Sequence, residues 1–374
     1  MMSKMNLKSL VLSSDDKTTR ILRRVLSDLE IDIEHCSTSD QMIRRLTRDR
    51  FEAFIVDCSD TDAARSTLRA IKAAPVNKRA LSIVLVESQI GLKGGFDMGA
   101  HFVLHKPLTV ERAKSSFRAV RALMKRERRA QLRVPVQIAL DCAGSLCRYR
   151  AKTLDLCEGG MAVQFDGQKP RESIFRFSFQ LPGVDPKFEF LGEMAWQGDN
   201  DQVGVRFRDL PPQQRLALRD WLNRQLPDIG PDDPPIPCRL TDLSLAACYV
   251  TTSAPFPVST RVILSIRAGG LEARVCGMVR IAHAEYGMGI EFLQSSPEYE
   301  DQLRPMVEIL RSKDGAAPEV AVEPDGLETA PQDMTASTPA SDDVLVKLFH
   351  QEAHLPVEAF LEQMQWQRQL EESS

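Results

Sequence analysis

The sequence lacks the features of a membrane-spanning, secreted or disulfide-stapled protein. No apolar run approaches the roughly 20 residues that a membrane-spanning helix requires, and residues 1–16 hold no apolar stretch long enough for a secretory signal. The eight cysteines are scattered, no CxxC occurs, and most of them stand in apolar, strand-like runs. Such cysteines are typical small core residues of a reduced protein, so we expect a cytoplasmic protein that does not cross a bilayer.

Motifs of the common nucleotide-dependent enzymes are absent as well. The sequence contains no P-loop, no GxGxxG and no arrangement of a nucleophile with a base, so we expect no enzymatic activity. The net charge of −4 argues against nucleic-acid binding by the chain as a whole. The 374 residues are 43% hydrophobic and 27% charged. This composition is that of a soluble globular protein, and the length predicts more than one domain.

Residues 5–125 alternate apolar runs with helical patterns. In the first helical pattern, Ile21, Leu22 and Val25 recur at helical spacing. Several of the runs are apolar throughout, as parallel strands buried on both faces tend to be. The strand-like runs stand at 7–14, 31–36, 51–58, 81–88 and 101–108. Strands and helices in alternation predict a doubly wound α/β domain, with its functional residues beyond the carboxyl ends of the strands.

Polar residues stand at the ends of three of these strands. Asp15 and Asp16 follow the first strand, Asp57 ends the third, and Lys106 follows the fifth. This arrangement resembles the receiver domain of two-component response regulators. In that family, acids after the first strand hold Mg²⁺, an Asp on the third accepts phosphate, and a Lys on the fifth pairs with it. The resemblance implies a Mg²⁺ site at Asp15, Asp16 and Asp57, with Asp57 as the phosphate acceptor and a histidine kinase as a partner.

Two departures from the receiver pattern leave two hypotheses open. Ser13 and Ser14 stand where the family usually places its two acids, and the fourth strand ends in Val86 and Glu87, where the family has Thr or Ser. A carboxylate at this place would repel an incoming phosphate. The domain is therefore either a receiver that is phosphorylated at Asp57 or a non-catalytic pseudo-receiver with the same fold.

The segment that follows, residues 112–133, is strongly basic and holds a single acid, Glu127. Phe117, Val120 and Leu123 form an apolar helical stripe in its first part, so we expect the last helix of the α/β domain to run into an arm. One interpretation of the basic residues is a solvated helix face. The other is electrostatic contact with nucleic acid, which is less favoured because no helix-turn-helix or zinc pattern accompanies the cluster.

Residues 126–228 carry strand patterns at short intervals. They are followed by a helical pattern in which Leu216, Leu218, Trp221 and Leu222 are placed to cover one end of a barrel. Many short strands with one helix predict a small antiparallel β-barrel. The strand-like runs stand at 133–140, 148–156, 159–165, 173–181, 188–196 and 202–207.

Two motifs in this stretch, RERRAQLR and DLCEGG, resemble the signature of PilZ domains. The RxxxR element and the D/N-x-S-x-x-G element of that family hold the second messenger cyclic di-GMP. The resemblance implies that Arg129 and Arg133 bind a phosphate and the edge of guanine, since the guanidinium fork matches both groups. Arg128 is a reserve phosphate contact.

The second motif supplies three more expected site residues. Asp155 matches the family Asp or Asn and would accept hydrogen bonds from guanine. Gly160 matches the motif glycine, which permits unusual backbone angles and close approach of the ligand. Cys157 stands where the family has Ser. Because a thiol is a weaker hydrogen-bond donor than a hydroxyl, we expect this departure to lower the affinity without removing binding.

The chain then repeats itself. TLDLCEGGMAV parallels LTDLSLAACYV, with Asp242 opposite the motif aspartate, Ser244 opposite the cysteine and Ala247 opposite the glycine. No RxxxR precedes the second copy; its linker is rich in proline and acids, which would repel a dianion. We therefore expect residues 229–312 to form a degenerate PilZ-like domain with a structural or partner-binding role.

The end of the sequence changes composition twice. Residues 313–341 are rich in proline, alanine and acids and are expected to form a disordered linker. Residues 342–372 are expected to form a helical tail, with Val357, Phe360 and Met364 in an apolar stripe that docks on this protein or on a partner.

Together these features predict a bacterial signalling adaptor. The GGEF and EAL motifs of cyclic di-GMP synthesis and hydrolysis are absent, so the sequence favours a protein that responds to this ligand. Binding would order residues 126–133 against the first barrel, reorient the receiver-like domain and alter contact with a downstream protein. The alternatives are a ligand-free scaffold of degenerate signalling domains and a phosphorylation-driven regulator that contacts nucleic acid through its basic arm.

Overall fold

The structure is a computed structural model, and it divides into two compact units. One unit contains Glu127–Pro231, and the other contains Asn6–Arg126 together with Asp232–Ser374. Within the described ranges, no helix is both long and apolar enough to cross a membrane. The structure describes residues 6–87, 91–144, 147–167, 172–185, 187–198, 201–225, 232–293, 297–311, 318–328, 343–351 and 355–372.

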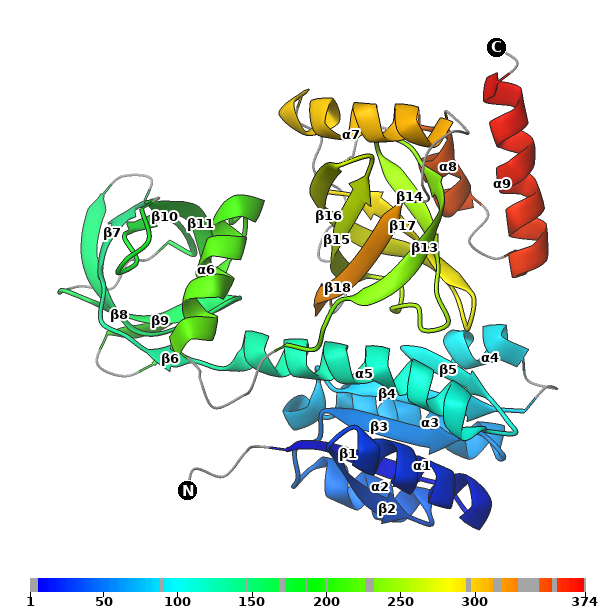
Figure 1. The fold of residues 1–374 in the computed structure, drawn as a ribbon. Coiled ribbons are helices and arrows are strands. Elements are labelled where there is room, and N and C mark those ends of the chain that lie inside the picture. Colours follow the sequence, from blue (N-terminus) through cyan, green and yellow to red (C-terminus); the bar gives the residue numbers. More distant parts are fainter. Residues whose placement is uncertain are drawn as a thin grey trace. The chain divides into compact units, whose positions relative to one another are not determined.

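The chain begins with a doubly wound α/β domain (Figure 1). Its five strands are all parallel, in the order β2-β1-β3-β4-β5. This is the strand order of the flavodoxin and chemotaxis-regulator folds, so the predicted receiver-like fold is confirmed. Its elements are β1 (Leu7–Leu12), α1 (Asp16–Asp28), β2 (Ile31–Cys36), α2 (Ser39–Leu46), β3 (Ala53–Asp57), α3 (Thr61–Ala73), η1 (Pro75–Asn77), β4 (Leu81–Val86), α4 (Gly91–Asp97), β5 (Phe102–His105) and α5 (Val110–Gln131).

The central strands of this sheet are buried on both faces. Every residue of β3 and β4 is buried. Neighbouring residues contribute to different cores, since Ile55 packs in one apolar cluster and Phe54 and Val56 pack in another. Successive side chains of a strand point to opposite faces. The continuous apolar runs in the sequence therefore serve two layers of helices, one on each side of the sheet.

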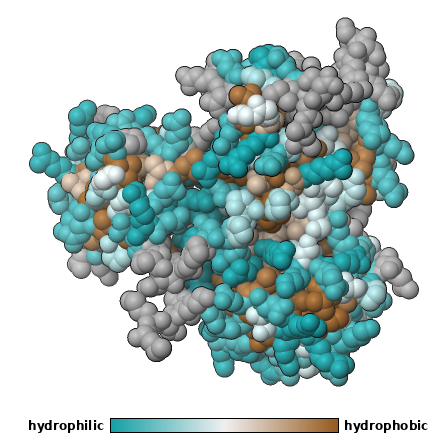
Figure 2. Space-filling view, viewed as in Figure 1, coloured by the Kyte–Doolittle hydropathy of each residue, from teal (hydrophilic) through white to brown (hydrophobic). Residues whose placement is uncertain are grey.

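The first barrel forms the unit that contains Glu127–Pro231. Its strands close in the cyclic order β8–β9–β12–β11–β10–β7, with β6 added at the edge of β8. The interior contains six phenylalanines among its 21 buried apolar residues, and Leu218, Trp221 and Leu222 of α6 pack into the same core. Where it is visible in Figure 2, the outer surface of this barrel is mainly hydrophilic. Its elements are β6 (Val134–Pro135), β7 (Ala139–Ala143), β8 (Arg148–Cys157), β9 (Gly160–Phe165), β10 (Ile174–Phe179), β11 (Phe188–Gln197), β12 (Gln202–Phe207) and α6 (Pro212–Gln225).

The second barrel also closes through six strands, in the cyclic order β13–β14–β17–β16–β15–β18. Leu303 and Met306 of α7 pack into its core. Its elements are β13 (Ile236–Leu243), β14 (Ala247–Thr251), β15 (Thr260–Ala268), β16 (Leu271–His283), β17 (Gly287–Phe292), α7 (Pro297–Arg311) and β18 (Glu319–Leu327).

Strand β18 corrects the expected boundaries at 312 and 313–341. Residues 319–327 lie within the segment expected to be a disordered linker, but they pair with β13 on one side and β15 on the other. Val320 and Val322 are buried in the core, as alternate residues of a strand should be. Pro324 and Gly326 lie in the same strand and gave the segment its linker-like composition. The rest of that segment from 329 onward lies outside the described residues.

The two barrels share one cyclic strand order, with one change in connectivity. Matching β8 to β13 places β18 where the first barrel has β7. However, β7 precedes the motif strand in the sequence, whereas β18 follows all the other strands. Both barrels also have a register shift next to the motif aspartate, beside Asp155 in one and Asp242 in the other. The internal repeat is therefore structural, and the second barrel is a circular permutation of the first.

Helix α5 joins the parallel sheet to the second barrel. Arg121 and Lys125 both contact Asp233, at 2.7 and 2.6 Å. Near the end of the helix, the buried Arg126 donates to the backbone oxygen and the carboxylate of Asp325 in β18, at 3.1 and 3.3 Å. These contacts tie the α/β domain and the second barrel into one unit.

Two helices lie in the region where the sequence predicts a helical tail. They are α8 (Val344–Gln351) and α9 (Val357–Glu372). Phe349 and Phe360 are buried against the outside of the second barrel, where they contact an apolar cluster around Tyr249. Figure 1 shows α8 beside the strands of that barrel.

Barrel closure by β18 gives the first prediction. Val322→Asp places a charge with no partner in the core, and we expect it to lower the free energy of unfolding by more than about 3 kcal/mol. Val258→Asp is the matched control, because Val258 lies in the same barrel but is 48% exposed, and it should change stability by less than about 0.5 kcal/mol. Urea unfolding of the full chain measures both. Equal stability of the two variants would contradict the closure of the barrel by β18.

Candidate ligand-binding and phosphate-acceptor sites

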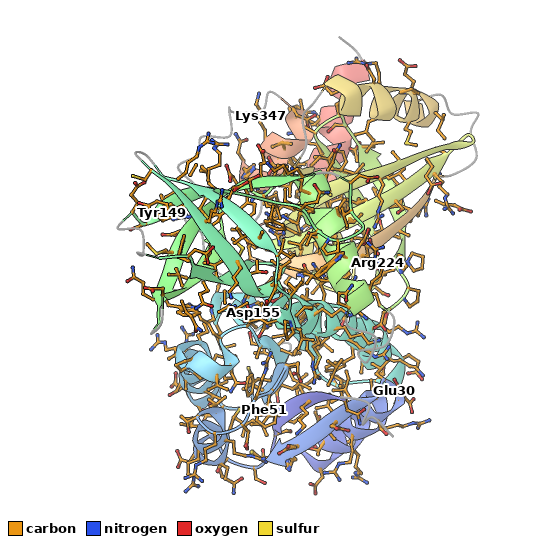
Figure 3. The ribbon with its side chains drawn as sticks, turned by 90° about the vertical axis from the view of Figure 1, so that its left-hand side faces the viewer. Glu30, Phe51, Tyr149, Asp155, Arg224 and Lys347 are labelled. Atoms are coloured by element: carbon orange, nitrogen blue, oxygen red, sulfur yellow. The ribbon has the colours of Figure 1, made fainter. Side chains whose placement is uncertain are left out.

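The structure brings together one residue from each of the two motifs in the first barrel. An Nη1 hydrogen of Arg133 is donated to Oδ1 of Asp155, with the two heavy atoms 2.7 Å apart. The Arg133 side chain is 43% exposed and that of Asp155 is 28% exposed. Figure 3 labels Asp155 on this barrel. A half-exposed guanidinium beside a carboxylate is a site that a planar polar ligand can reach.

Backbone pairing explains why these two residues meet. The short strand β6 pairs with the end of β8, with Val134 opposite Leu156 and Pro135 opposite Asp155. Arg133 directly precedes β6, so the pairing fixes its backbone next to the motif. The carboxylate of Asp155 also accepts a hydrogen bond from the backbone N–H of Ala162 at 3.2 Å, which fixes its orientation.

The arm before β6 is more regular than the sequence suggests. Helix α5 extends to Gln131, so Arg128 and Arg129 lie in its last turn. Arg128 is partly exposed, whereas Arg129 is only 7% exposed. The expected ordering of residues 126–133 by a ligand therefore does not start from an extended arm. A ligand contact to Arg129 would instead require a movement of this last helical turn.

The structure requires glycine at the motif position for a reason other than the expected backbone angles. Gly160 does not lie in the left-handed region of backbone conformation. Instead, a Cβ atom at this position would collide with the backbone oxygen of Val205 in β12. The absence of a side chain thus permits the close pairing of β9 with β12.

The motif serine also has a structural role, which the second barrel reveals. Ser244 Oγ accepts hydrogen bonds from the backbone N–H groups of Ala246 and Ala247, at 3.3 and 3.0 Å, and so stabilises the turn between β13 and β14. Cys157 occupies the same place in the first barrel and is buried. A thiol is a poorer acceptor than a hydroxyl, so we expect Cys157 to stabilise its turn less than Ser244 does.

Trp196 is a candidate site residue that the sequence interpretation missed. The strand registers place Asp155, Ala162, Gly204 and Trp196 in one row across β8, β9, β12 and β11. The indole of Trp196 lies over Gly204 and is 44% exposed. An exposed tryptophan that faces a glycine on the neighbouring strand indicates a candidate ligand surface. The sequence alone does not show this pair, because the strand pairing must be known first. The row from Asp155 to Trp196 is referred to below as the outer row.

The second candidate site, at the carboxyl ends of the parallel strands, is built around Asp57. Lys106 Nζ lies 2.8 Å from Oδ1 and 3.1 Å from Oδ2 of this buried carboxylate. Ser13 Oγ donates to Oδ2 at 2.9 Å, and Ser59 Oγ donates to Oδ1 at 2.8 Å. The structure thus brings Asp57 and Lys106 together, and Ser13 and Ser59 each contact one oxygen of the Asp57 carboxylate.

The structure does not gather the predicted Mg²⁺ ligands. Asp15 is the N-cap of α1, and its carboxylate accepts from the backbone N–H of Lys17 and the hydroxyl of Thr18 at 2.9 and 2.5 Å. The hydrogen bond from the Thr18 hydroxyl is the main cause that lowers the pKa of Asp15. Asp16 is exposed in the first turn of the same helix.

No group of three acidic, histidine or cysteine side chains within the described ranges could hold a metal ion. Asp15, Asp16 and Asp57 therefore do not form such a group. Ser13, rather than an acid, follows β1 at the position that contacts Asp57. The positive charge beside the Asp57 carboxylate comes from Lys106.

Basic residues of the connector are neutralised by acids of their own unit. Arg112 pairs with Glu285, and Lys114 contacts Asp28 at 3.4 Å. Arg121 and Lys125 pair with Asp233, and Arg126 pairs with Asp325. The acidic linker that was expected to repel a dianion thus supplies Asp233 as a partner for α5. Charges that are paired in this way release fewer counterions on contact with nucleic acid, which weakens the nucleic-acid alternative.

Comparison with family models identifies the first barrel. Residues 127–224 match the model of the PilZ domain. The first barrel is a PilZ domain. The match begins at Glu127, where the compact unit of this barrel also begins, and it ends within α6.

Comparison with solved structures adds neighbours of low similarity. One is the chemotaxis response regulator CheY4 of Vibrio cholerae, with 17% identity and a TM-score of 0.29, covering 31% of this chain and 99% of that chain. Another is the magnesium-bound receiver domain of the sensor histidine kinase PA1611 from Pseudomonas aeruginosa PAO1, with 18% identity and a TM-score of 0.29, covering 32% and 98%. A comparison with curated proteins found no match. The receiver-like assignment follows from the strand order of the sheet.

The Asp57 site gives the second prediction. Lys106→Met leaves the buried carboxylate without its cation, and we expect a loss of about 3 kcal/mol in the free energy of unfolding. Asp57→Asn in the same chain removes the unpaired charge, so the double variant should recover most of that loss. Urea unfolding of the two single variants and the double variant gives the coupling energy. Additive losses would show that the Lys106–Asp57 pair does not stabilise this domain.

Proposed function

We propose that the PilZ domain binds cyclic di-GMP through Arg129, Arg133 and Asp155. The observation that carries the proposal is the contact between Arg133 and Asp155, because it unites the two halves of the PilZ signature in one half-exposed site. The ligand is a dianion with two guanine bases. A guanidinium matches the phosphate and the guanine edge, and a carboxylate accepts from the guanine N1–H and amino groups.

In this proposal the ligand replaces an internal partner of each residue. Arg133 exchanges the carboxylate of Asp155 for a phosphate or a guanine edge, and Asp155 turns to the donors of the base. Arg128 remains a reserve phosphate contact, since it is partly exposed in the same helical turn. Cys157 and Gly160 act through the turn and the strand pairing rather than by direct contact, as their surroundings favour.

The signal would pass through the end of α5. Arg126 belongs to the unit of the receiver-like domain and is anchored on Asp325, whereas Arg129, one turn later, belongs to the PilZ unit. A ligand that draws Arg129 toward the site changes the last turn of α5, which connects the two units. This change alters contact with a downstream protein only if the ligand binds the two arrangements with different affinity.

The receiver-like domain acts in this proposal as a pseudo-receiver. Both oxygens of Asp57 are engaged by Lys106 and by a serine hydroxyl. Phosphoryl transfer to such a carboxylate relies on a divalent cation held by neighbouring acids, and the residue beside Asp57 is Ser13. The histidine kinase is therefore not a partner in this reading, and the downstream protein is the expected partner.

Isothermal titration of the full chain with cyclic di-GMP gives the third prediction. Wild type should bind, and Arg133→Ala should weaken binding roughly tenfold to a hundredfold, because hydrogen bonds to charged groups contribute about 1.5–3 kcal/mol. Asp155→Ala should weaken binding in a similar way. Asp242→Ala is the matched control, since Asp242 holds the equivalent position in the second barrel, and it should leave the affinity unchanged.

Each outcome of the titration decides one part of the proposal. An absence of heat with wild type would reject cyclic di-GMP binding and favour the ligand-free scaffold. Full affinity in Arg133→Ala would reject the site, and a loss in Asp242→Ala would move the site to the second barrel.

The pseudo-receiver reading gives the fourth prediction. Incubation with acetyl phosphate and Mg²⁺ should produce no phosphate adduct at Asp57, as measured by mass spectrometry of the intact chain and its peptides. Asp57→Asn serves as the blank for adducts at other residues. A Mg²⁺-dependent adduct in wild type that is absent from Asp57→Asn would restore the phosphorylation hypothesis.

A further inference from the structure

The second barrel has a counterpart of the outer row, and it is covered by the tail. The strand registers place Asp242, Tyr249, Gly289 and Ile281 in one row, in the same order as Asp155 to Trp196 in the PilZ domain. Tyr249 and Ile281 pack in one apolar cluster with residues of α8 and α9. The tail helices therefore occupy the face that corresponds to the candidate ligand face of the first barrel.

Two phenylalanines of the tail make the central contacts. A Cβ atom built on Gly289 would lie 2.6 Å from Cζ of Phe349, so the missing side chain admits this ring. The ring of Phe360 lies 5.5 Å from that of Tyr249 and 4.9 Å from that of His283, measured between centroids. Both phenylalanines are fully buried. Aromatic anchors in a small-residue gap are typical of the way an amphipathic helix is recognised.

The covered face is separate from the interior of the barrel. Residues of β14 and β17 that point inward, such as Val250 and Ile290, belong to the main core, whereas Tyr249 and Ala247 belong to the cluster shared with the tail. No tail residue within the described ranges is a member of the main core. The tail can thus leave the face without opening the barrel.

The motif residues of the second barrel now line a cavity that the tail helps to close. Asp242 and Ser244 share a hollow of about 300 Å³ with Arg304 of α7 and with Asp343 and Met364 of the tail segment. Asp343 caps α8 by accepting from the backbone N–H of Leu345 at 3.0 Å. Three carboxylates, those of Asp242, Glu308 and Asp343, line this hollow beside one cation, Arg304, so its net charge is negative and disfavours a dianionic nucleotide.

We infer that the second barrel is a helix-binding module, and that α8 and α9 are its releasable ligand in cis. The partner it fits is an amphipathic helix with two aromatic anchors, and the occupants in this protein are its own helices α8 and α9. A helix as short as α8 is only marginally stable alone in water, so these helices depend on docking and lose order when they leave. This inference is independent of cyclic di-GMP binding by the PilZ domain.

A labelled peptide of residues 342–372 tests the inference on the full chain, and this is the fifth prediction. The variant Phe349→Ala/Phe360→Ala removes the anchors of the chain's own tail and exposes the face, so it should bind the wild-type peptide at least tenfold more tightly than wild type does. Lys347→Ala is the matched control on α8, because Lys347 is exposed (labelled in Figure 3). It should bind the peptide no better than wild type.

Equal binding of the peptide to wild type and to the double variant, or no binding to either, would overturn the inference. Hydrogen exchange in unmodified wild type decides the matter if the double variant does not fold. Amides of α8 and α9 should exchange at least tenfold faster than those of β14 and β17, since the tail undocks while the barrel stays closed. Equal rates would show that the tail is an inseparable part of the barrel.

Discussion

Each barrel must be closed by a sixth strand, and the two barrels differ in where that strand stands in the sequence. A sheet edge leaves backbone groups without partners, so each barrel needs a strand between β8 and β10 or between β13 and β15. In the PilZ domain this strand, β7, precedes the motif strand and brings β6 and the arginine segment with it. In the second barrel it is β18, which arrives from the other end of the chain. Among the residues that the structure describes, no strand equivalent to β6 pairs with β13 beside Asp242. The equivalent outer face is covered by the tail.

Helix α5 links this difference to the rest of the molecule. Its basic residues pair with acids of the second barrel, and the last of these pairs, Arg126 with Asp325, is buried. One turn further along the same helix, Arg129 belongs to the PilZ unit. The boundary between the two units therefore lies within a single helix, and a ligand that acts on its last turn acts at this boundary.

Much of the fold could be predicted from the sequence, because its patterns are local. The buried parallel strands, strands β8 to β12 of the PilZ domain and the repeat of DLCEGG in LTDLSLA follow from periodicity and motif spacing. The single strand expected at 133–140 is divided into β6 and β7. Strand β18 was not predicted because Pro324, Gly326 and the acids of this segment are typical of a linker. Its two buried valines are recognisable as core residues only once the strand is seen to pair with β13 and β15.

In the two candidate sites, too, contacts that follow from local patterns could be predicted, whereas contacts between distant residues could not. The approach of Lys106 to Asp57 follows from strand order, but the spacing after β1 did not reveal that Asp15 caps a helix and that Ser13 takes the contact. Likewise, the pairing of basic residues in α5 with Asp233 depends on a residue more than a hundred positions away. The place of Trp196 in one row with Asp155 could be recognised only from the register of four strands.

The central claim is that ligand recognition is confined to the PilZ domain. Hydrogen exchange of the full chain with and without saturating cyclic di-GMP tests it most directly, because each segment reports separately. If the ligand binds only there, we expect slower exchange at residues 129–135 and 155–162, with no change at the equivalent residues 242–249. Protection at 242–249, or protection in neither barrel, would contradict it.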